Sequence, residues 1–155
     1  MDSTVLGQCF SLLNRRGQAI ITVACEQLDI SYSEYVILLR LFEAEGRTQD
    51  ELADFLCLDK AVITRMVKEL EKKGLVRREK DLRDKRMKHL YVTDLARALE
   101  VKLVAILDTW FGYLFADLSD EEREKTLKVL RSAAQRAATM SPRKFSSLIE
   151  RRNLR

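Results

Sequence analysis

The side chains of this chain best suited to binding chemistry are the cations gathered between Lys60 and Lys88. This segment of 29 residues holds 12 basic and five acidic residues, so its local net charge of +7 exceeds the +4 of the whole chain. Such a concentrated positive patch suits a polyanionic partner. Because a charge run can also be a solvated helix face, its interpretation depends on the elements that carry it.

Side chains for catalysis or metal binding are scarce in the sequence. The chain has one histidine, His89, and contains no GxSxG, HExxH or P-loop pattern. Its three cysteines, Cys9, Cys25 and Cys57, form no CxxC pair, which argues against a disulfide framework and a thiolate zinc site. A lone histidine likewise argues against a metal-sensing cluster. We therefore expect no enzyme, no catalytic or metal site and no cofactor.

The composition favours a helical, globular protein. Of 155 residues, 46% are hydrophobic, five are glycine and one is proline, so the chain can bury a core and has few turn signals. No apolar run reaches the roughly 18 residues that a membrane span requires. The N-terminus lacks the basic flank and cleavage site of a signal peptide, so we expect a cytoplasmic protein without membrane contact.

Two short helices are predicted in the middle of the chain. Thr48 and Glu51 form a capping-box pair that would open the first helix, over residues 49–56. Asp59 is a good N-cap for the second helix, which Gly74 would end. Their lengths and short connection match a helix-turn-helix. Apolar residues spaced three and four apart would give the second helix one buried face, namely Val62, Ile63, Met66, Val67 and Leu70.

A β-hairpin is predicted directly after these helices. Residues 75–79 and 89–92 are rich in strand formers. The connection between them, residues 80–87, is long and contains no glycine, so we expect a protruding loop rather than a tight turn. A hairpin that follows a helix-turn-helix is a wing.

The helix and the wing would offer their cations to the two grooves of DNA. A recognition helix enters the major groove, and a slim cationic loop can enter the narrow minor groove. A carboxylate on that loop would repel phosphate, so we expect Asp84 to hold the loop in shape through an ion pair with a neighbouring arginine. The candidate contacts are Asp59, Lys60, Ala61, Thr64, Arg65 and Lys68 on the helix and Arg83, Asp84, Lys85, Arg86 and Lys88 on the wing.

Four further amphipathic helices are predicted, which makes six in all. One covers residues 4–28, and a second would be capped by Ser33 and stopped by Gly46. A third runs from Thr93 to about residue 116, and a capping box of Ser119 and Glu122 opens the last, which would end before Pro142. The predicted fold class is mainly α with a small β-hairpin wing.

The apolar stripes of the terminal helices exceed what a lone winged helix could cover, which argues for a homodimer. We therefore divide the chain into a helical dimerisation region, a winged helix-turn-helix domain and a basic tail. The predicted bounds are 1–32 and 94–140 for dimerisation, 33–93 for the winged helix (helix-turn-helix about 48–73, wing about 75–93) and 141–155 for the tail.

The segment from Thr48 to Thr93 resembles the winged helix of the multiple-antibiotic-resistance regulator (MarR) family. Residues 81–86, Asp-Leu-Arg-Asp-Lys-Arg, fit the D-x-R-D-x-R pattern of that family's wing tip, and residues 67–78, VKELEKKGLVRR, are similar to the segment before it. With the flanking helices, the resemblance covers roughly residues 5–138.

The resemblance implies a dimeric DNA-binding regulator, commonly a repressor, that binds a pseudo-palindromic operator and responds to a small molecule or an oxidant. By motif match, Thr64 and Arg65 would contact bases or phosphates, Arg86 would enter the minor groove and Asp84 would be its structural partner. Ala61 departs from the serine often found at this position, which removes one hydroxyl contact.

The nature of the signal stays open at this point. An anionic or phenolic effector could meet Arg15 or Arg16 between walls formed by Tyr35, Trp110 and Phe111. Alternatively, Cys9 could be a peroxide-sensing thiol, although a cysteine on an apolar stripe more often packs in a core. A winged helix used only for protein contact is a further alternative, which the basic wing disfavours.

Overall fold

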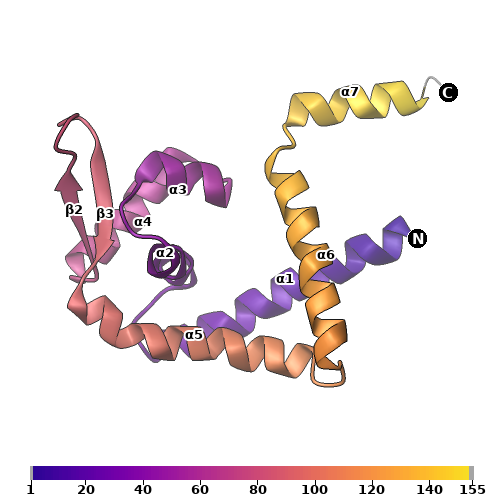
Figure 1. Ribbon diagram of the computed structural model, residues 1–155, viewed down its shortest axis with the longest axis horizontal. Coiled ribbons are helices and arrows are strands. Elements are labelled where there is room, and N and C mark those ends of the chain that lie inside the picture. Colours follow the sequence, from indigo (N-terminus) through magenta and orange to yellow (C-terminus); the bar gives the residue numbers. More distant parts are fainter. Residues whose placement is uncertain (1, 154–155) are drawn as a thin grey trace. The chain divides into compact units, whose positions relative to one another are not determined.

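The protein is a chain of helices with one small sheet (Figure 1). The computed structural model describes residues 2–153, without the side chains of residues 142, 152 and 153, so predictions for residues 1, 154 and 155 lie outside it. The elements are α1 (Ser3–Glu26), α2 (Tyr32–Glu43), β1 (Arg47–Thr48), α3 (Gln49–Leu56), α4 (Lys60–Lys72), β2 (Val76–Lys80), β3 (Lys88–Val92), α5 (Asp94–Leu114), α6 (Asp120–Ala138) and α7 (Pro142–Asn153).

The described residues form seven helices, so the prediction of six was wrong. The additional helix is α7, which lies in the segment predicted to be only a basic tail. Proline is compatible with the first turn of a helix because the missing N–H group would have no partner there. Pro142 therefore begins a new helix, although the sequence suggested only that it ends the preceding one. The small strand β1 was also not predicted.

Capping side chains set the beginnings of several helices. The predicted boxes of Thr48 with Glu51 and Ser119 with Glu122 are both present. The prediction that Ser33 caps α2 was wrong, because Ser31 takes this role. The hydroxyl of Ser31 accepts the Glu34 N–H at 3.2 Å, and the Glu34 carboxylate accepts the Ser31 N–H at 2.7 Å. This reciprocal pair leaves Ser33 inside the helix.

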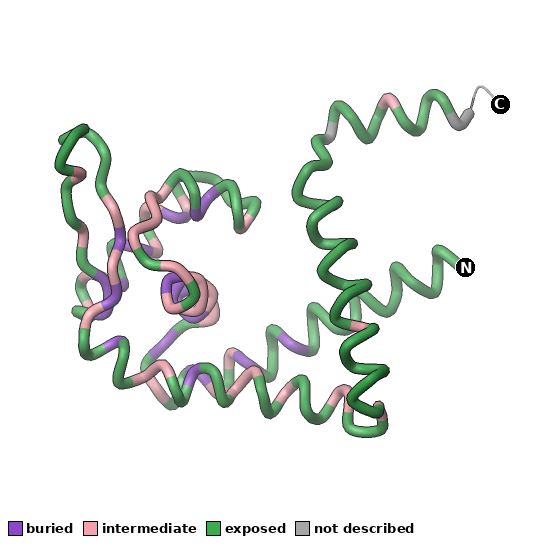
Figure 2. Tube along the Cα trace, viewed as in Figure 1, coloured by how far each residue is buried: buried purple, intermediate pink, exposed green. Residues whose placement is uncertain are grey.

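The core is built around α2, whose Ile37, Leu38 and Leu41 are fully buried. Figure 2 shows this concentration of buried positions on α2 and on the segments beside it. The helix packs against α1, α4, α5 and β3. The helices α1, α3, α4 and α5 and the strands β2 and β3 also bury side chains in this core, including Cys25, Leu52, Ile63, Leu90 and Leu103. The orientation of α4 and of the sheet therefore depends on this helix.

The three strands form an antiparallel sheet in the order β1-β3-β2. His89 on β3 lies opposite Glu79 on β2 and Thr48 on β1. The two long strands form the predicted wing, and residues 81–87 connect them. Since β1 directly precedes α3, the sheet joins the wing to the start of the helix-turn-helix.

The chain divides into two units, residues 1–114 and residues 115–155. The second unit holds α6 and α7, and α6 has no buried residue. Leu127, Val129 and Leu130 on α6 are exposed apolar side chains. Among the described residues, no helix combines the length and apolar character needed to cross a membrane.

Gly74 lies just after the C-terminal end of α4 and has a left-handed backbone conformation, with φ of +68°. A Cβ atom at this position would meet no atom within 4 Å, so only backbone strain opposes a larger residue. We expect Gly74→Ala to lower the free energy of unfolding by about 1 kcal/mol, because the left-handed region costs L-residues about 1–2 kcal/mol. Urea unfolding at a fixed protein concentration measures this change.

Gly74→Asn is the matched control, since asparagine tolerates the left-handed region better than alanine. We expect its stability to lie between those of the wild type and Gly74→Ala. An alanine variant as stable as the wild type would show that this backbone conformation does not limit stability.

Candidate nucleic-acid interface

The recognition helix α4 has one buried side and one exposed side. Ile63, Val67 and Leu70 are fully buried against the core. Along the opposite side, Lys60, Ala61, Arg65 and Lys68 are exposed and Thr64 is half-buried. This division follows from the helical period, which separates the two sets of residues. The packing of α4 therefore leaves its polar side open to a large ligand.

A partly buried ion pair fixes the end of α4 against the start of α2. The Lys73 Nζ lies 3.0 Å from the Glu34 carboxylate and also donates to the Asp29 carbonyl at 2.5 Å. Burial disfavours ionisation of Glu34, but hydrogen bonds from Ser31 and Lys73 outweigh it and hold the pKa of this carboxyl below its ordinary value. The pair therefore anchors the segment between α4 and the wing.

Some basic side chains between Lys60 and Lys88 form ion pairs with acidic residues, and others do not. Lys60 Nζ lies 2.6 Å from Asp50, and Arg78 Nη2 lies 2.8 Å from Glu71. Because Lys60 and Asp50 are both largely exposed, solvent screens this pair and a polyanion can compete for the lysine. Within the part of the chain that the structure describes, no ion pair involves Arg65, Lys68, Arg83, Lys85, Arg86 or Lys88.

The wing tip is shaped by two aspartates that accept backbone hydrogen bonds. Asp81 Oδ1 accepts from the N–H groups of Arg83 at 2.7 Å and Asp84 at 2.8 Å. Asp84 Oδ1 accepts from the N–H of Arg86 at 3.0 Å. The predicted ion pair of Asp84 with a neighbouring arginine is not formed. The carboxylate stabilises the turn through the backbone, which leaves both arginine side chains exposed on a defined loop.

His89 joins this loop to the far edge of the sheet. Its Nδ1 lies 2.6 Å from the Gly46 carbonyl oxygen, just before β1, and its Nε2 lies 3.1 Å from Asp81 Oδ2. Both contacts raise the pKa of His89, the Gly46 carbonyl being the larger cause. The sequence did not indicate this link, because Gly46 is distant from His89 in the chain.

The predicted DNA contacts thus lie on two elements. Six of these residues lie on α4 or at its N-cap position, and five lie on the wing loop or at the first residue of β3. Asp59 occupies the N-cap position of α4 as expected, but its side chain makes no capping hydrogen bond. The start of α4, where no side chain caps the backbone N–H groups, is suited to an anion.

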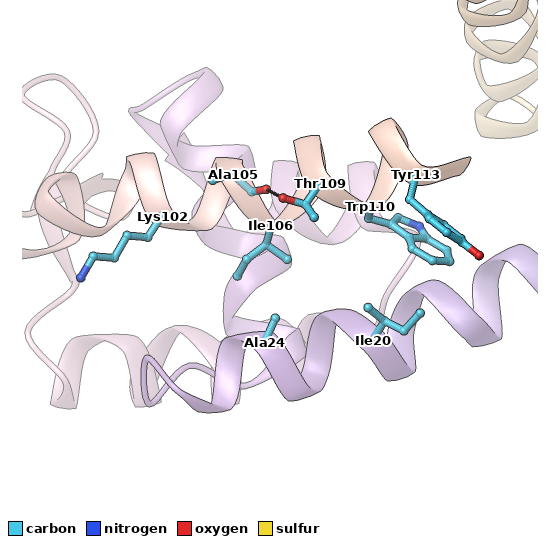
Figure 3. Close-up of a pocket in the computed structure, with 8 residues that line it drawn as sticks. All are labelled: Ile20, Ala24, Lys102, Ala105, Ile106, Thr109, Trp110 and Tyr113. Atoms are coloured by element: carbon cyan, nitrogen blue, oxygen red, sulfur yellow. Dashed lines mark hydrogen bonds between the residues drawn. The ribbon is translucent and has the colours of Figure 1, made fainter. Parts of the chain in front are cut away.

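A separate, largely apolar cavity of about 610 Å³ lies between α1 and α5 (Figure 3). The ring of Trp110 stacks with that of Tyr113, their centroids 6.3 Å apart. Lys102 is the one basic residue among those that line this cavity. Spacings of three and four along α5 could have identified its α5 side. The lining residues are Ile20, Ala24, Lys102, Ala105, Ile106, Thr109, Trp110 and Tyr113.

Of the five predicted effector contacts, the structure places only Trp110 at this cavity. Tyr35 is buried in the core, whereas Arg15 and Arg16 are exposed on α1 and Phe111 is exposed on α5. Arg15 donates hydrogen bonds to Ser11 within its own helix. The five side chains are therefore not brought together in this chain.

The three cysteines are free and differ in exposure. Cys9 and Cys57 are exposed, so Cys9 does not pack in the core of this chain. Cys25 is fully buried, and burial raises the pKa of its thiol to about 11, which disfavours the reactive thiolate. Among the described residues, no group of three or more His, Cys, Asp or Glu side chains is arranged to hold a metal ion.

Comparison with known proteins agrees with this architecture. Residues 30–88 match the MarR family profile. The organic hydroperoxide resistance transcriptional regulator of Bacillus subtilis is 34% identical over 108 residues, which cover 70% of this chain and 69% of that protein. This chain belongs to the MarR family.

Another MarR relative is the transcriptional regulator TtmR of Methylorubrum extorquens, 31% identical over 123 residues, or 79% of this chain. The match spans only 62% of the length of TtmR. A MarR regulator structure from Methanosarcina mazei aligns with a TM-score of 0.81 at 27% identity, covering 87% of this chain and 97% of that one.

The same fold occurs in a MarR-family structure from Listeria monocytogenes solved with a 26-mer DNA. It has a TM-score of 0.80 at 21% identity and covers 84% of this chain and 87% of that one. The named relatives are transcriptional regulators, in agreement with the expectation that this protein is not an enzyme.

Proposed function

We propose that this MarR-family protein is a homodimeric transcriptional regulator that binds double-stranded DNA through α4 and the wing. The observation that carries the proposal is the set of unpaired, exposed cations on these two elements. They lie on a helix whose other side is buried and on a loop with a defined turn. A rigid display of this kind lowers the ordering cost of binding.

The two elements would read DNA in different ways. Lys60, Thr64, Arg65 and Lys68 would face base edges and phosphates in the major groove. The Asp59 carboxylate makes no capping hydrogen bond, so it can accept a hydrogen bond from a cytosine amino group. The wing tip, residues 83–86, would reach the flanking minor groove. The structure of the Listeria relative with DNA supports a nucleic-acid partner for this fold.

Arg86→Ala tests the wing contribution. We expect DNA affinity to fall by about tenfold or more, because an arginine that contacts DNA contributes on the order of 1–3 kcal/mol. The measurement is fluorescence anisotropy with a duplex that the wild-type protein has enriched from random-sequence DNA. Arg136→Ala on α6 removes the same charge outside the Lys60–Lys88 segment and should bind like the wild type.

The salt dependence separates this proposal from a protein-contact role. Each phosphate neutralised contributes about −0.9 to the slope of log K against log salt for B-DNA. We therefore expect a steep negative slope for the wild type and a shallower one for Arg86→Ala. Unchanged affinity and slope in Arg86→Ala would remove the wing from the interface.

The apolar surface of the terminal helices supports the homodimer. On α1, exposed apolar side chains include Val5, Leu6, Phe10, Leu12 and Leu13. On α6, which has no buried residue, the exposed apolar side chains are Leu127, Val129 and Leu130. Large exposed apolar surfaces of this kind mark association sites, and a two-fold dimer would cover both helices at once.

Leu127→Glu tests the contribution of α6 to that dimer. Burying an unpaired polar group costs about 2–7 kcal/mol, so we expect the dimer Kd to rise by roughly 100-fold or more. Sedimentation velocity over a range of protein concentrations measures it. Leu82→Glu is the matched control, because Leu82 is 98% exposed on the wing. Two variants with identical dimer stability would exclude Leu127 from the interface.

We further propose that the protein acts as a repressor of a pseudo-palindromic operator and is released by a small-molecule effector. The cavity between α1 and α5 supports a ligand with an apolar ring and an anionic group. Trp110 and Tyr113 offer aromatic surfaces, and Lys102 offers the cation. Arg15 and Arg16 would contribute only if dimerisation brings them to the ligand.

A thiol switch is the second candidate mechanism. It is favoured by the exposure of Cys9 and by the similarity to a regulator of organic hydroperoxide resistance. A switch at Cys9 predicts that cumene hydroperoxide lowers the DNA affinity of the wild type and of Cys57→Ser but not of Cys9→Ser. The binding assay described above measures this response. Equal responses of the wild type and Cys9→Ser would exclude Cys9 as the sensor.

A further inference from the structure

The contacts of His89 require a particular protonation state. The Gly46 carbonyl oxygen can only accept a hydrogen bond, so the Nδ1 atom 2.6 Å away must carry a proton. Asp81 Oδ2, 3.1 Å from Nε2, is also an acceptor when the carboxyl is ionised. Hydrogen bonds to this carboxylate from the Asp84, Arg83 and His89 groups lower the pKa of Asp81. Both contacts therefore form together only with the doubly protonated imidazolium.

These contacts add a side-chain link between the wing loop and the turn before β1, two parts of the DNA-binding unit that the sheet also connects. Gly46 lies at the turn before β1, and its N–H donates to Leu90 of β3. Asp81 organises the wing loop, because its other oxygen accepts from Arg83 and Asp84. A proton on His89 thus ties the loop that presents the wing arginines to the start of the helix-turn-helix.

We propose that His89 is a positioning residue whose imidazolium clamps the wing loop to the Gly46 turn, so that wing-mediated DNA binding weakens when this histidine loses its proton. The inference rests on the proposed function, since it assumes that the wing contacts DNA. It adds a pH-dependent control of that contact. It assigns no direct DNA contact to the histidine itself.

The charged surroundings of His89 are mixed. Glu79 lies directly opposite it on β2, and the Glu51 carboxylate at the start of α3 also favours the imidazolium. Glu79 is itself paired with Arg77, and Glu51 with the Thr48 capping box. The remaining charged neighbours are Lys80, Asp81, Arg83 and Lys88. Asp81 is the one acidic group in direct contact with the ring.

The direction of the pH effect follows from the protonation of the clamp. The Gly46 carbonyl and the Asp81 carboxylate stabilise the imidazolium, so the pKa of His89 lies above its ordinary value of 6.5. The clamp is complete below that ordinary value and is lost as pH rises through the raised pKa. The clamp is also lost at low pH, because the Asp81 carboxylate is protonated below its own lowered pKa.

His89 is the sole histidine of the chain, so its titration can be followed without interference in the tag-free protein. We expect NMR of the imidazole in the wild type, without DNA, to give a pKa above 6.5 and to show protons on both ring nitrogens below it. Asp81→Asn is the matched variant. It retains the oxygen that accepts from Arg83 and Asp84, but it replaces the acceptor facing Nε2 with a donor.

We expect Asp81→Asn to return the His89 pKa toward the ordinary value. A wild-type pKa at or below 6.5, or one that this variant leaves unchanged, would overturn the clamp. This NMR titration requires no DNA, so its result is independent of the proposed function.

The second experiment measures affinity for the enriched duplex at about pH 6 and about pH 8, a range in which histidine is the side chain that ordinarily titrates. If DNA binding raises the His89 pKa by one unit, the wild-type affinity falls about tenfold across the titration. His89→Asn retains a donor at the position of Nδ1 but does not titrate. We expect it and Asp81→Asn to show little change with pH.

The outcomes distinguish the two proposals. A wild-type pH profile that both variants reproduce would overturn the positioning role, even if the NMR titration shows the clamp. Absence of DNA binding at every pH, with the expected NMR titration, would instead overturn the proposed function. A coupled titration together with a pH profile that both variants flatten supports the inference.

Discussion

The structure depends on the burial of one side of α4 against α2 and the sheet. Ile63, Val67 and Leu70 have no exposed surface, and they lie against a helix whose own Ile37, Leu38 and Leu41 are equally buried. Fully burying side chains of this size is worth roughly 1.5–3 kcal/mol each, which exceeds the energy of any exposed ion pair in the molecule. Apolar packing therefore orients α4, and the cations occupy the side that remains.

Ion pairs and hydrogen bonds then refine an arrangement that packing has set. Lys73 and Glu34 connect the end of α4 to the start of α2, and Lys60 and Asp50 connect its beginning to α3. The wing follows a different rule, because residues 81–87 have no apolar core of their own. Its shape comes from carboxylates that accept backbone N–H groups and from His89. The acidic residues of this loop thus stabilise its conformation.

The local features of this protein could be predicted from the sequence because they depend on neighbouring residues. Capping boxes at Thr48 and Ser119, the amphipathic period of α4 and the strand formers of the wing all act within a few positions. The cap of α2 was misassigned because Ser31 and Ser33 both lie near its start, and the choice depends on the glutamate three residues after Ser31. The helix α7 was missed because proline can begin a helix as well as end one.

Contacts between distant segments could not be predicted in the same way. No local pattern indicates that His89 meets Gly46, or that Lys102 and Trp110 share a cavity with Ile20. These contacts depend on how α1, α5 and the sheet pack. The predicted effector residues were chosen by chemical type, and Trp110 is the one among them that lines this cavity. Family resemblance indicated the fold and the candidate DNA contacts but not which side chains would line a cavity.

The central claim is that two copies of this chain present α4 and the wing to one DNA duplex. A hydroxyl-radical footprint on the enriched duplex tests it most directly. Recognition helices of a two-fold dimer meet major grooves about 34 Å, or one helical turn, apart. We expect two symmetric protected regions with that spacing, each flanked by a minor-groove protection that is lost in Arg86→Ala. A single unbroken protected region, or flanking protections that persist in that variant, would contradict it.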